Sequence, residues 1–466
     1  MRAVAVLSVI FFHFGFQKFS GGFTGVDVFF VISGYLITNN IVSDIEKGTF
    51  TFSNFYLRRV RRLFPALFVT ILLTFAYGFF VFPGSLLEPL AKSVVASVLS
   101  VSNILFWSEA GYFDADAELK PLLHTWSLSV EEQFYFVWPA LLVFLSQMRR
   151  VWIVPAFAVI AGAISLWAAQ QWLVSDPSGA FFLAPFRITE FAVGALCVWL
   201  LRWRGGYGRL DEFFVIAGLV LIALPITTFS HSTPFPGLTA LVPATGTALL
   251  ICSGQARFSG RLLSNRWLVA IGLISYSAYL VHWPLFVYVT YGRISPLRLE
   301  QQLILVFVTM GLAALMYRYV ELPFRQPASA SRFRSNQTYA VSCMALAFTL
   351  VSAAGLEVYA GGLGWKTIKG EVAIDSRMED WKRGRYSLLK KVCHDHKDGH
   401  CNNVNPGTNF LIIGDSHAPD AIVILRGGTS IQLHPQFNRR MPATRCIRFR
   451  DLEAWASGPR EVHRPQ

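Results

Sequence analysis

The chain has 466 residues, of which 53% are hydrophobic and only 15% are charged, and 41 Lys/Arg against 28 Asp/Glu give a net charge of +13. Soluble domains carry about 25% charged residues, so this composition excludes an ordinary water-soluble globule, and the apolar content excludes intrinsic disorder. Residues 1–358 hold 41 charged side chains and the shorter segment 359–466 holds 28. We therefore expect a membrane domain followed by a soluble segment.

Apolar stretches long enough to cross a bilayer, which needs about 20 residues, recur along the first part of the chain. The first is not a signal peptide, because it lacks a small-residue cleavage site and runs into further apolar segments. The candidate stretches are 3–19, 26–42, 63–82, 89–107, 128–147, 151–170, 180–201, 213–229, 236–253, 267–290, 302–320 and 338–358.

Loop charge predicts the orientation, because Lys and Arg stay on the cytoplasmic side. Positive charge is concentrated in alternate loops, except that the alternation breaks between Arg62 and Arg149. We expect 89–107, the least apolar stretch, not to cross. This leaves eleven spans, with a cytoplasmic N-terminus and an exported C-terminal segment. The alternative is twelve crossings and a cytoplasmic tail. The basic loops are 43–62, 148–150, 202–212, 254–266 and 321–337.

Arg2 and His13 flank the first stretch. Eleven residues are about 16 Å and three turns of helix, so both side chains share one face. Histidine titrates near neutrality, which makes a mid-membrane His13 a candidate general base. The alternative is a histidine that only hydrogen-bonds a neighbouring helix.

Four arginines, Arg58, Arg59, Arg61 and Arg62, lie in FYLRRVRRLFPAL at a membrane edge. Such a cluster suits a phosphate-rich ligand such as a nucleotide-bearing cofactor. The alternative is a basic anchor that contacts lipid headgroups.

Further polar residues enter other apolar stretches, where charges are costly and usually functional. Two adjacent carboxylates, Glu131 and Glu132, follow the start of a helix in LHTWSLSVEEQFYFVWP. Two carboxylates that enter the membrane need a cationic or hydrogen-bonding partner. We assign a second set to substrate binding, although an interior ion pair would also explain two of its members. That set is Asp27 in GGFTGVDVFFVISGYLIT, Trp126, Arg187 and Glu190 in PFRITEFAVG, and His282 in ISYSAYLVHWPLF.

These motifs, with YRYVELPFR, resemble the acyltransferase-3 family of membrane O-acyltransferases over roughly residues 1–325. The resemblance implies transfer of an acyl group, usually acetyl, from cytoplasmic acyl-coenzyme A to a sugar hydroxyl across the membrane. It places His13 and Arg2 in the reaction, the four arginines near acetyl-coenzyme A, and both glutamates in the cavity. It also implies ten core spans and one linking span. The family's usual lead-in before the arginine is not present before Arg2, so we expect a misplaced start.

The soluble segment contains NFLIIGDSH at 409–417, an apolar run that ends in a turn. It resembles the first block of the α/β SGNH-hydrolase fold, in which Ser416 would be the nucleophile. The fold's Asp-x-x-His is not found after Ser416, so we expect an incomplete domain with little activity of its own. Cys393 and Cys401 favour a small disulfide loop over a metal site.

The expected domains are therefore 1–325, the acyltransferase; 326–358, a linker and last span; 359–408, a periplasmic linker; and 409–466, the incomplete SGNH-like domain. The predicted activity is acetylation of a surface polysaccharide such as the O-antigen of lipopolysaccharide. Expected partners are membrane lipid and a polysaccharide or lipid-linked glycan, with no nucleic acid and no metal. The alternatives are a secondary transporter or glycan exporter, and an inactive pseudoenzyme.

Overall fold

The computed structural model describes residues 1–110, 119–148, 150, 152–204, 208–230, 232–256, 259–291, 293, 296–325 and 336–361. The chain divides into two compact units, Met1–Thr367 and Ile368–Gln466, and all described residues belong to the first. Ser416, Cys393 and Cys401 lie outside them, so the SGNH-like domain and the disulfide remain predictions.

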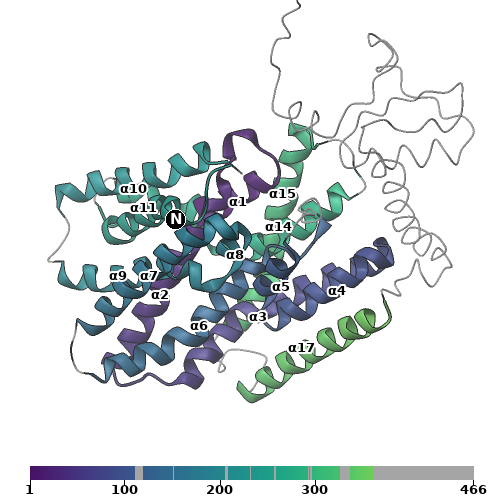
Figure 1. Ribbon diagram of the computed structural model, residues 1–466, viewed down its shortest axis with the longest axis horizontal. Helices are drawn as coiled ribbons and strands as arrows, with labels where there is room; N and C mark the ends of the chain where they lie inside the picture. The colour runs from purple at the N-terminus through teal and green to yellow at the C-terminus, as the bar shows by residue number, and fades with distance from the viewer. Residues whose placement is uncertain are drawn as a thin grey trace, which may run out of the picture. The chain divides into compact units, whose positions relative to one another are not determined.

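The described part of the first unit is built of helices and contains no strand (Figure 1). The helices that matter most below are α1, α3, α6 and α14. The α-helices are α1 (Arg2–His13), α2 (Gly25–Glu46), α3 (Phe52–Val81), α4 (Gly84–Val98), α5 (Ser102–Glu109), α6 (Thr125–Ser146), α7 (Ile153–Ser175), α8 (Pro177–Phe182), α9 (Ile188–Trp203), α10 (Arg209–Thr228), α11 (Leu241–Ser253), α12 (Ser259–Leu263), α13 (Arg266–Leu273), α14 (Ser275–Thr290), α15 (Leu299–Met316), α16 (Leu322–Arg325) and α17 (Asn336–Tyr359).

Eight helices in the described part are long and apolar enough to cross a membrane, and a bent pair, α13 and α14, would make a ninth. The predicted helical, multi-pass membrane protein is thereby confirmed. Two further apolar helices, Arg2–His13 and Gly237–Ser253, are shorter than this length. The count of eleven spans requires both of them to cross, and it stays a prediction.

Helix α1 is shorter than the predicted stretch 3–19. It ends at His13, and Gly15 follows in the left-handed region at φ +84°, a conformation that glycine adopts without steric cost. Twelve residues make a helix of about 18 Å, against a hydrocarbon core of about 30 Å. His13 therefore lies at the end of a helix too short to span the hydrocarbon core, and the residue is half-buried.

Helix α3 begins earlier than the predicted stretch 63–82. Thr51 caps its start by accepting a hydrogen bond from the Asn54 backbone N–H (3.3 Å). The predicted basic loop 43–62 was therefore wrong in its second half, since the four arginines lie on a helix. Helical spacing then decides which of them face inward.

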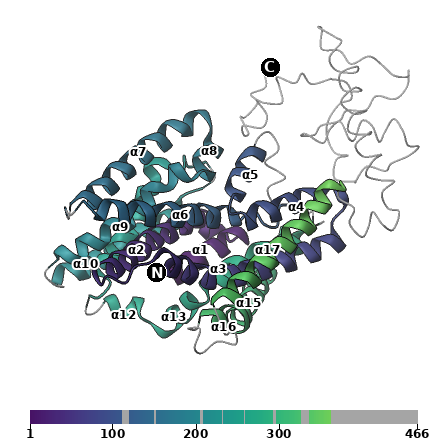
Figure 2. The same cartoon turned by 90° about the horizontal axis from the view of Figure 1, so that it is seen from below.

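The segment predicted not to cross, 89–107, is a broken helix. It consists of the end of α4 and nearly all of α5, separated at Ser100, which has φ +57°. Neither α4 nor α5 is among the helices long enough to cross. Figures 1 and 2 show α17 running beside α4 at one margin of the helical unit.

Helices α2 and α9 approach each other closely through glycine. A Cβ atom at Gly34 would lie 2.2 Å from the Phe191 carbonyl oxygen, and one at Gly194 would lie 2.0 Å from that of Val31. Small residues allow such approach between helices in a membrane. This contact fixes α2 against α9 and holds α2 beside α1, where the candidate site is built.

Candidate active site

Helix α1 is buried between α2, α13 and α14, and its two ends carry Arg2 and His13. The interior residues Ala5, Val6, Val9 and Ile10 have no exposed surface. A helix so fully enclosed holds its two polar ends at a fixed separation. The sequence prediction that these two residues belong to one helix is confirmed.

His13 forms a dyad with His282 of α14. The His13 Nδ1 atom lies 3.0 Å from His282 Nε2, and the rings are stacked with a centroid distance of 5.2 Å. His282 Nδ1 lies 2.6 Å from the Tyr279 carbonyl oxygen, which can only accept, so Nδ1 carries the proton. In neutral His282, Nε2 is then the acceptor and His13 Nδ1 the donor, which leaves the basic lone pair of His13 on Nε2.

A third histidine, His124, packs against this dyad. Its ring centroid is 5.7 Å from that of His282 and 5.6 Å from that of Tyr279, and the residue is buried. The Trp283 ring meets His13 edge-on at 4.6 Å. Aromatic rings therefore surround the dyad, in which His282 is buried and His13 is half-buried.

Glu131 of α6 anchors a hydrogen-bond network across to α2. Ser33 donates to Oε1 at 2.9 Å, and the Tyr135 hydroxyl lies 3.1 Å from Oε2 and 3.0 Å from Ser33 Oγ. All three residues line a cavity of about 690 Å³. Glu131 therefore faces the cavity, where the sequence placed it.

Arg2, Arg59 and Arg62 line the same cavity, so α1 and α3 direct three positive charges into it. Within the described residues, the Nε atoms of Arg59 and Arg62 are buried with no hydrogen-bond partner. Buried unsatisfied donors are costly, and guanidinium groups match phosphate oxygens in geometry. These residues therefore fit a phosphate-bearing ligand such as acyl-coenzyme A.

The other two arginines of the cluster do not line this cavity. Arg58 is exposed and pairs with Asp44 at 2.7 Å. Arg61 is likewise outside the cavity lining. The structure thus divides the four arginines by helical face, with positions 59 and 62 one turn apart on the inner face.

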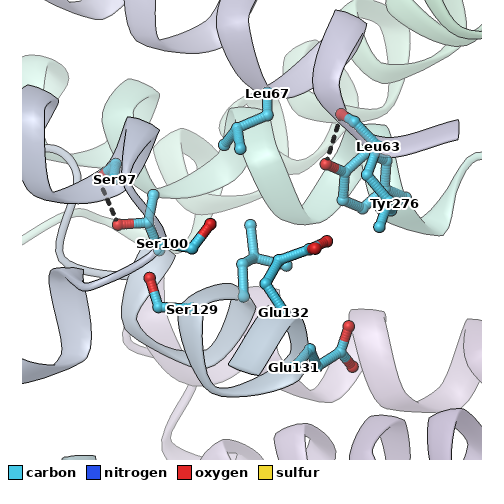
Figure 3. A pocket seen from close by; sticks show the side chains of 10 residues that line it. Leu63, Leu67, Ser97, Ser100, Ser129, Glu131, Glu132 and Tyr276 are labelled. Atoms are coloured by element: carbon cyan, nitrogen blue, oxygen red, sulfur yellow. Dashed lines mark hydrogen bonds between the residues drawn. The ribbon is translucent and has the colours of Figure 1, made fainter. Parts of the chain in front are cut away.

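Glu132 faces a smaller pocket of about 330 Å³ on another side of α6. Figure 3 shows its carboxylate directed into the pocket and that of Glu131 directed away. Ser97, Ser100 and Ser129 also line this pocket, so the broken α4–α5 segment supplies part of its wall. The two pockets share Leu63, Leu128, Glu131 and Tyr276.

Arg187 lies at the centre of a separate buried cluster. Its Nη1 atom is 3.0 Å from Asp27 and 3.4 Å from Glu190, and all three side chains are buried. The guanidinium also stacks near Trp126, 5.5 Å from the ring centroid. Four of the five predicted substrate-binding residues thus form one cluster, while the fifth, His282, belongs to the dyad.

The geometry can be compared with known proteins. Residues 1–318 match the family described as the acyltransferase domain. The chain belongs to this family.

Two relatives with similar sequences are bacterial proteins. The chain is 33% identical over 354 residues to the peptidoglycan O-acetyltransferase OatA of Listeria monocytogenes, a match that covers 72% of this chain and 56% of the relative. It is 30% identical over 349 residues to the O-acetyltransferase OatA of Staphylococcus aureus, covering 70% and 56%. The chain thus spans little more than half the length of these relatives. No solved structure matches it.

Several residues of the candidate site carry no obvious signal in the sequence. Ser33, Tyr135, Tyr276 and Tyr279 line the cavity, yet each reads as an ordinary helical residue. A signal exists in their spacing, because Glu131 and Tyr135 are four apart and share a helical face. His124 was not assigned a role from the sequence.

Glu321 is a further buried carboxylate that sequence reasoning did not single out. It accepts a hydrogen bond from Ser277 Oγ at 2.7 Å and pairs with Arg325. These contacts attach the end of the acyltransferase domain to α14, the helix that carries His282. In the described residues, no group of three or more His, Cys, Asp or Glu side chains could hold a metal ion.

Proposed function

We propose that this protein transfers an acetyl group from acetyl-coenzyme A to a carbohydrate hydroxyl outside the cytoplasm. The observation that carries the proposal is that α1 places Arg2 in an arginine-lined cavity at one end and His13 in a histidine dyad at the other. A phosphate-binding group and a general base on one buried helix suit acyl transfer from a phosphate-bearing donor. Membership of the acyltransferase family supports this reading over a transporter.

The phosphates of the donor would be held by Arg2, Arg59 and Arg62. The negative charge of Glu131 would attract the Arg2 guanidinium, and its carboxylate would orient the neighbouring hydroxyls by accepting their hydrogen bonds. When bound, acetyl-coenzyme A supplies an activated thioester. The exposed Arg58, and Arg61, which does not line the cavity, then serve orientation in the membrane rather than donor binding.

His13 acts as the general base. Its Nε2 lone pair takes the proton of the acceptor hydroxyl as the oxygen attacks the acyl carbon. The C–O bond forms, the C–S bond breaks, and the proton passes to the leaving thiolate. His282 keeps His13 in the required tautomer by accepting from Nδ1–H, and it shares the resulting positive charge through that bond.

Peptidoglycan is the acceptor we propose. The relative in Listeria monocytogenes bears that substrate in its name, and this favours peptidoglycan over the O-antigen expected from the sequence. We place the protein in the bacterial cytoplasmic membrane with its C-terminal segment outside. There Ser416, in an intact SGNH-like domain, would receive the acyl group for delivery to the glycan.

The test is acetylation of peptidoglycan in cells that express the protein. His13→Ala should abolish alkali-labile acetate on isolated peptidoglycan, because no base remains to activate the hydroxyl. Gln17→Ala, an exposed substitution just beyond the same helix, is the matched control and should leave acetylation unchanged. Wild-type acetylation in His13→Ala cells would refute the proposed mechanism. Export of glycan without acetylation would favour the transporter.

A further inference from the structure

Two helical faces lead from the arginine-lined cavity toward the histidine dyad. On α6 the cavity-lining residues Ser127, Leu128, Glu131 and Tyr135 follow helical spacing, and one turn before Ser127 lies His124. Each step toward the start of α6 thus moves from the cavity toward the histidines.

On α14 the cavity is lined by Ser275, Tyr276 and Tyr279, and the next residue on that face is His282. The cavity lining includes neither His282 nor His13. Side chains therefore separate the donor cavity from His13. On each helix this separation lies between the last residue that lines the cavity, Ser127 or Tyr279, and the histidine one turn further on.

Tyr279 and Ser127 form this separation, which we call the wall. Their hydroxyl oxygens lie 2.6 Å apart, and the Tyr279 hydroxyl donates to the His124 carbonyl oxygen at 3.0 Å. Ser127 Oγ also donates to the His124 carbonyl oxygen, at 3.3 Å, so the two hydroxyls and this carbonyl form one closed set of hydrogen bonds. Tyr279 is buried, and its own backbone carbonyl accepts the proton of His282 Nδ1. One residue thus closes the cavity and holds the dyad.

We propose that the Tyr279 side chain, latched by Ser127, sets the length of the acyl group that this enzyme accepts. This inference rests on the proposed function. The acyl end of a donor whose phosphates lie at Arg2, Arg59 and Arg62 points toward the wall, and it reaches His13 only when the ring swings aside. A two-carbon group needs little displacement of the ring, whereas a longer chain must force the ring and its two hydrogen bonds open.

Binding of unreactive probes tests the wall without relying on turnover. Coenzyme A thioethers with two-, four- and six-carbon chains are titrated against the full-length protein in membranes. In the wild type, affinity should fall by about tenfold or more from the two- to the six-carbon probe, the discrimination typical of a pocket that rejects extra methylenes. In Tyr279→Leu the fall should shrink to about threefold or less.

Tyr276→Leu is the matched control, because it removes a similar ring from the lining of the same cavity. Tyr276 is not part of the wall, and its hydroxyl donates instead to the Leu63 carbonyl oxygen at 2.8 Å. Its length dependence should stay that of the wild type. Ser127→Ala and Tyr279→Phe weaken the latch but leave the ring in place, and they should relax the length dependence by about twofold, the worth of a weak hydrogen bond.

Each outcome decides the inference. Length dependence that persists in both Tyr279→Leu and Tyr279→Phe overturns it, even where acetyl transfer by the wild type stands. If Tyr279→Leu does not accumulate in membranes, Tyr279→Phe, which keeps the ring, decides alone. A wild type that binds no coenzyme A thioether refutes the proposed donor, which is a different failure.

Discussion

Arg58 and Arg59 are adjacent in the chain but lie in different surroundings. Arg58 pairs with Asp44 at the surface, whereas Arg59 faces the cavity with a buried, unsatisfied Nε. Removing Arg59 should raise the KM for acetyl-coenzyme A by about tenfold or more, the effect of losing a charged hydrogen bond to phosphate. Arg58→Ala carries the same loss of charge on the same helix and should leave KM within about twofold. Steady-state transfer in membrane vesicles measures both, and equal KM changes would contradict the division of the cluster.

His282 should act through His13 rather than on the substrate. His282→Phe removes the acceptor of the His13 Nδ1 proton, so kcat should fall by about 10²-fold or more with KM for the donor unchanged. His282→Gln presents an amide oxygen to His13 and should recover part of that loss. Transfer rates for the two variants at saturating donor check this, and equal loss in both would argue that position 282 serves packing alone.

At the level of single residues, the sequence identified the groups that are costly in lipid. His13, Glu131 and Glu132 stood out because charged or titratable side chains rarely enter apolar stretches. Tyr279 did not stand out, because a tyrosine in a membrane helix has many ordinary explanations. Its role depends on the distance to Ser127, 152 residues away in the chain, and no local pattern encodes that pairing.

The broken helix formed by α4 and α5 turns on Ser100. At φ +57° a residue with a Cβ is strained by about 1–2 kcal/mol, which glycine avoids. Ser100→Gly should therefore raise the thermal midpoint of the detergent-solubilised protein by a few degrees, whereas Ser100→Val should lower it.

Ser97→Gly is the matched control for this element. It lies inside α4 and its hydroxyl is 2.8 Å from that of Thr125, so the same substitution three residues earlier should lower the midpoint. Fluorescence-monitored thermal unfolding measures both midpoints, and we expect an increase for Ser100→Gly and a decrease for Ser97→Gly. A decrease in both would mean that the left-handed turn at Ser100 does not govern the stability of this element.

At the level of elements, the sequence predicted where helices lie better than where they end. Hydropathy located every long span, because a run of about 20 apolar residues is typical of a helix that crosses a membrane. Helix α1 ends at His13, shortly before Gly15, and α3 begins early, directly after its cap Thr51. Both bounds depend on single turn or capping residues within apolar surroundings. Such local signals are weak beside the hydropathy of the flanking stretches.

For the whole molecule, the sequence could give family and class but not the arrangement of the site. The cavity draws on α1, α2, α3, α6 and α14, so residues as distant in the chain as Arg2 and Tyr279 line one cavity. Close packing of α2 and α9 through Gly34 and Gly194 positions α2, which supplies part of that lining. These are long-range contacts, and only the folded chain shows them.

Topology is the property of the whole chain that remains to be measured. We expect residue 83, before α4, and residue 109, at the end of α5, to lie on the same side of the membrane, because neither helix is among those long enough to cross. In a chain whose six cysteines are replaced by serine, cysteines introduced at both positions should react with a membrane-impermeant thiol reagent added to intact cells. A cysteine at Gly48, between α2 and α3, should react only after the cells are opened, because positive loops stay inside. Reaction of positions 83 and 109 from opposite sides would establish twelve crossings and a cytoplasmic tail, and would remove the periplasmic setting proposed for Ser416.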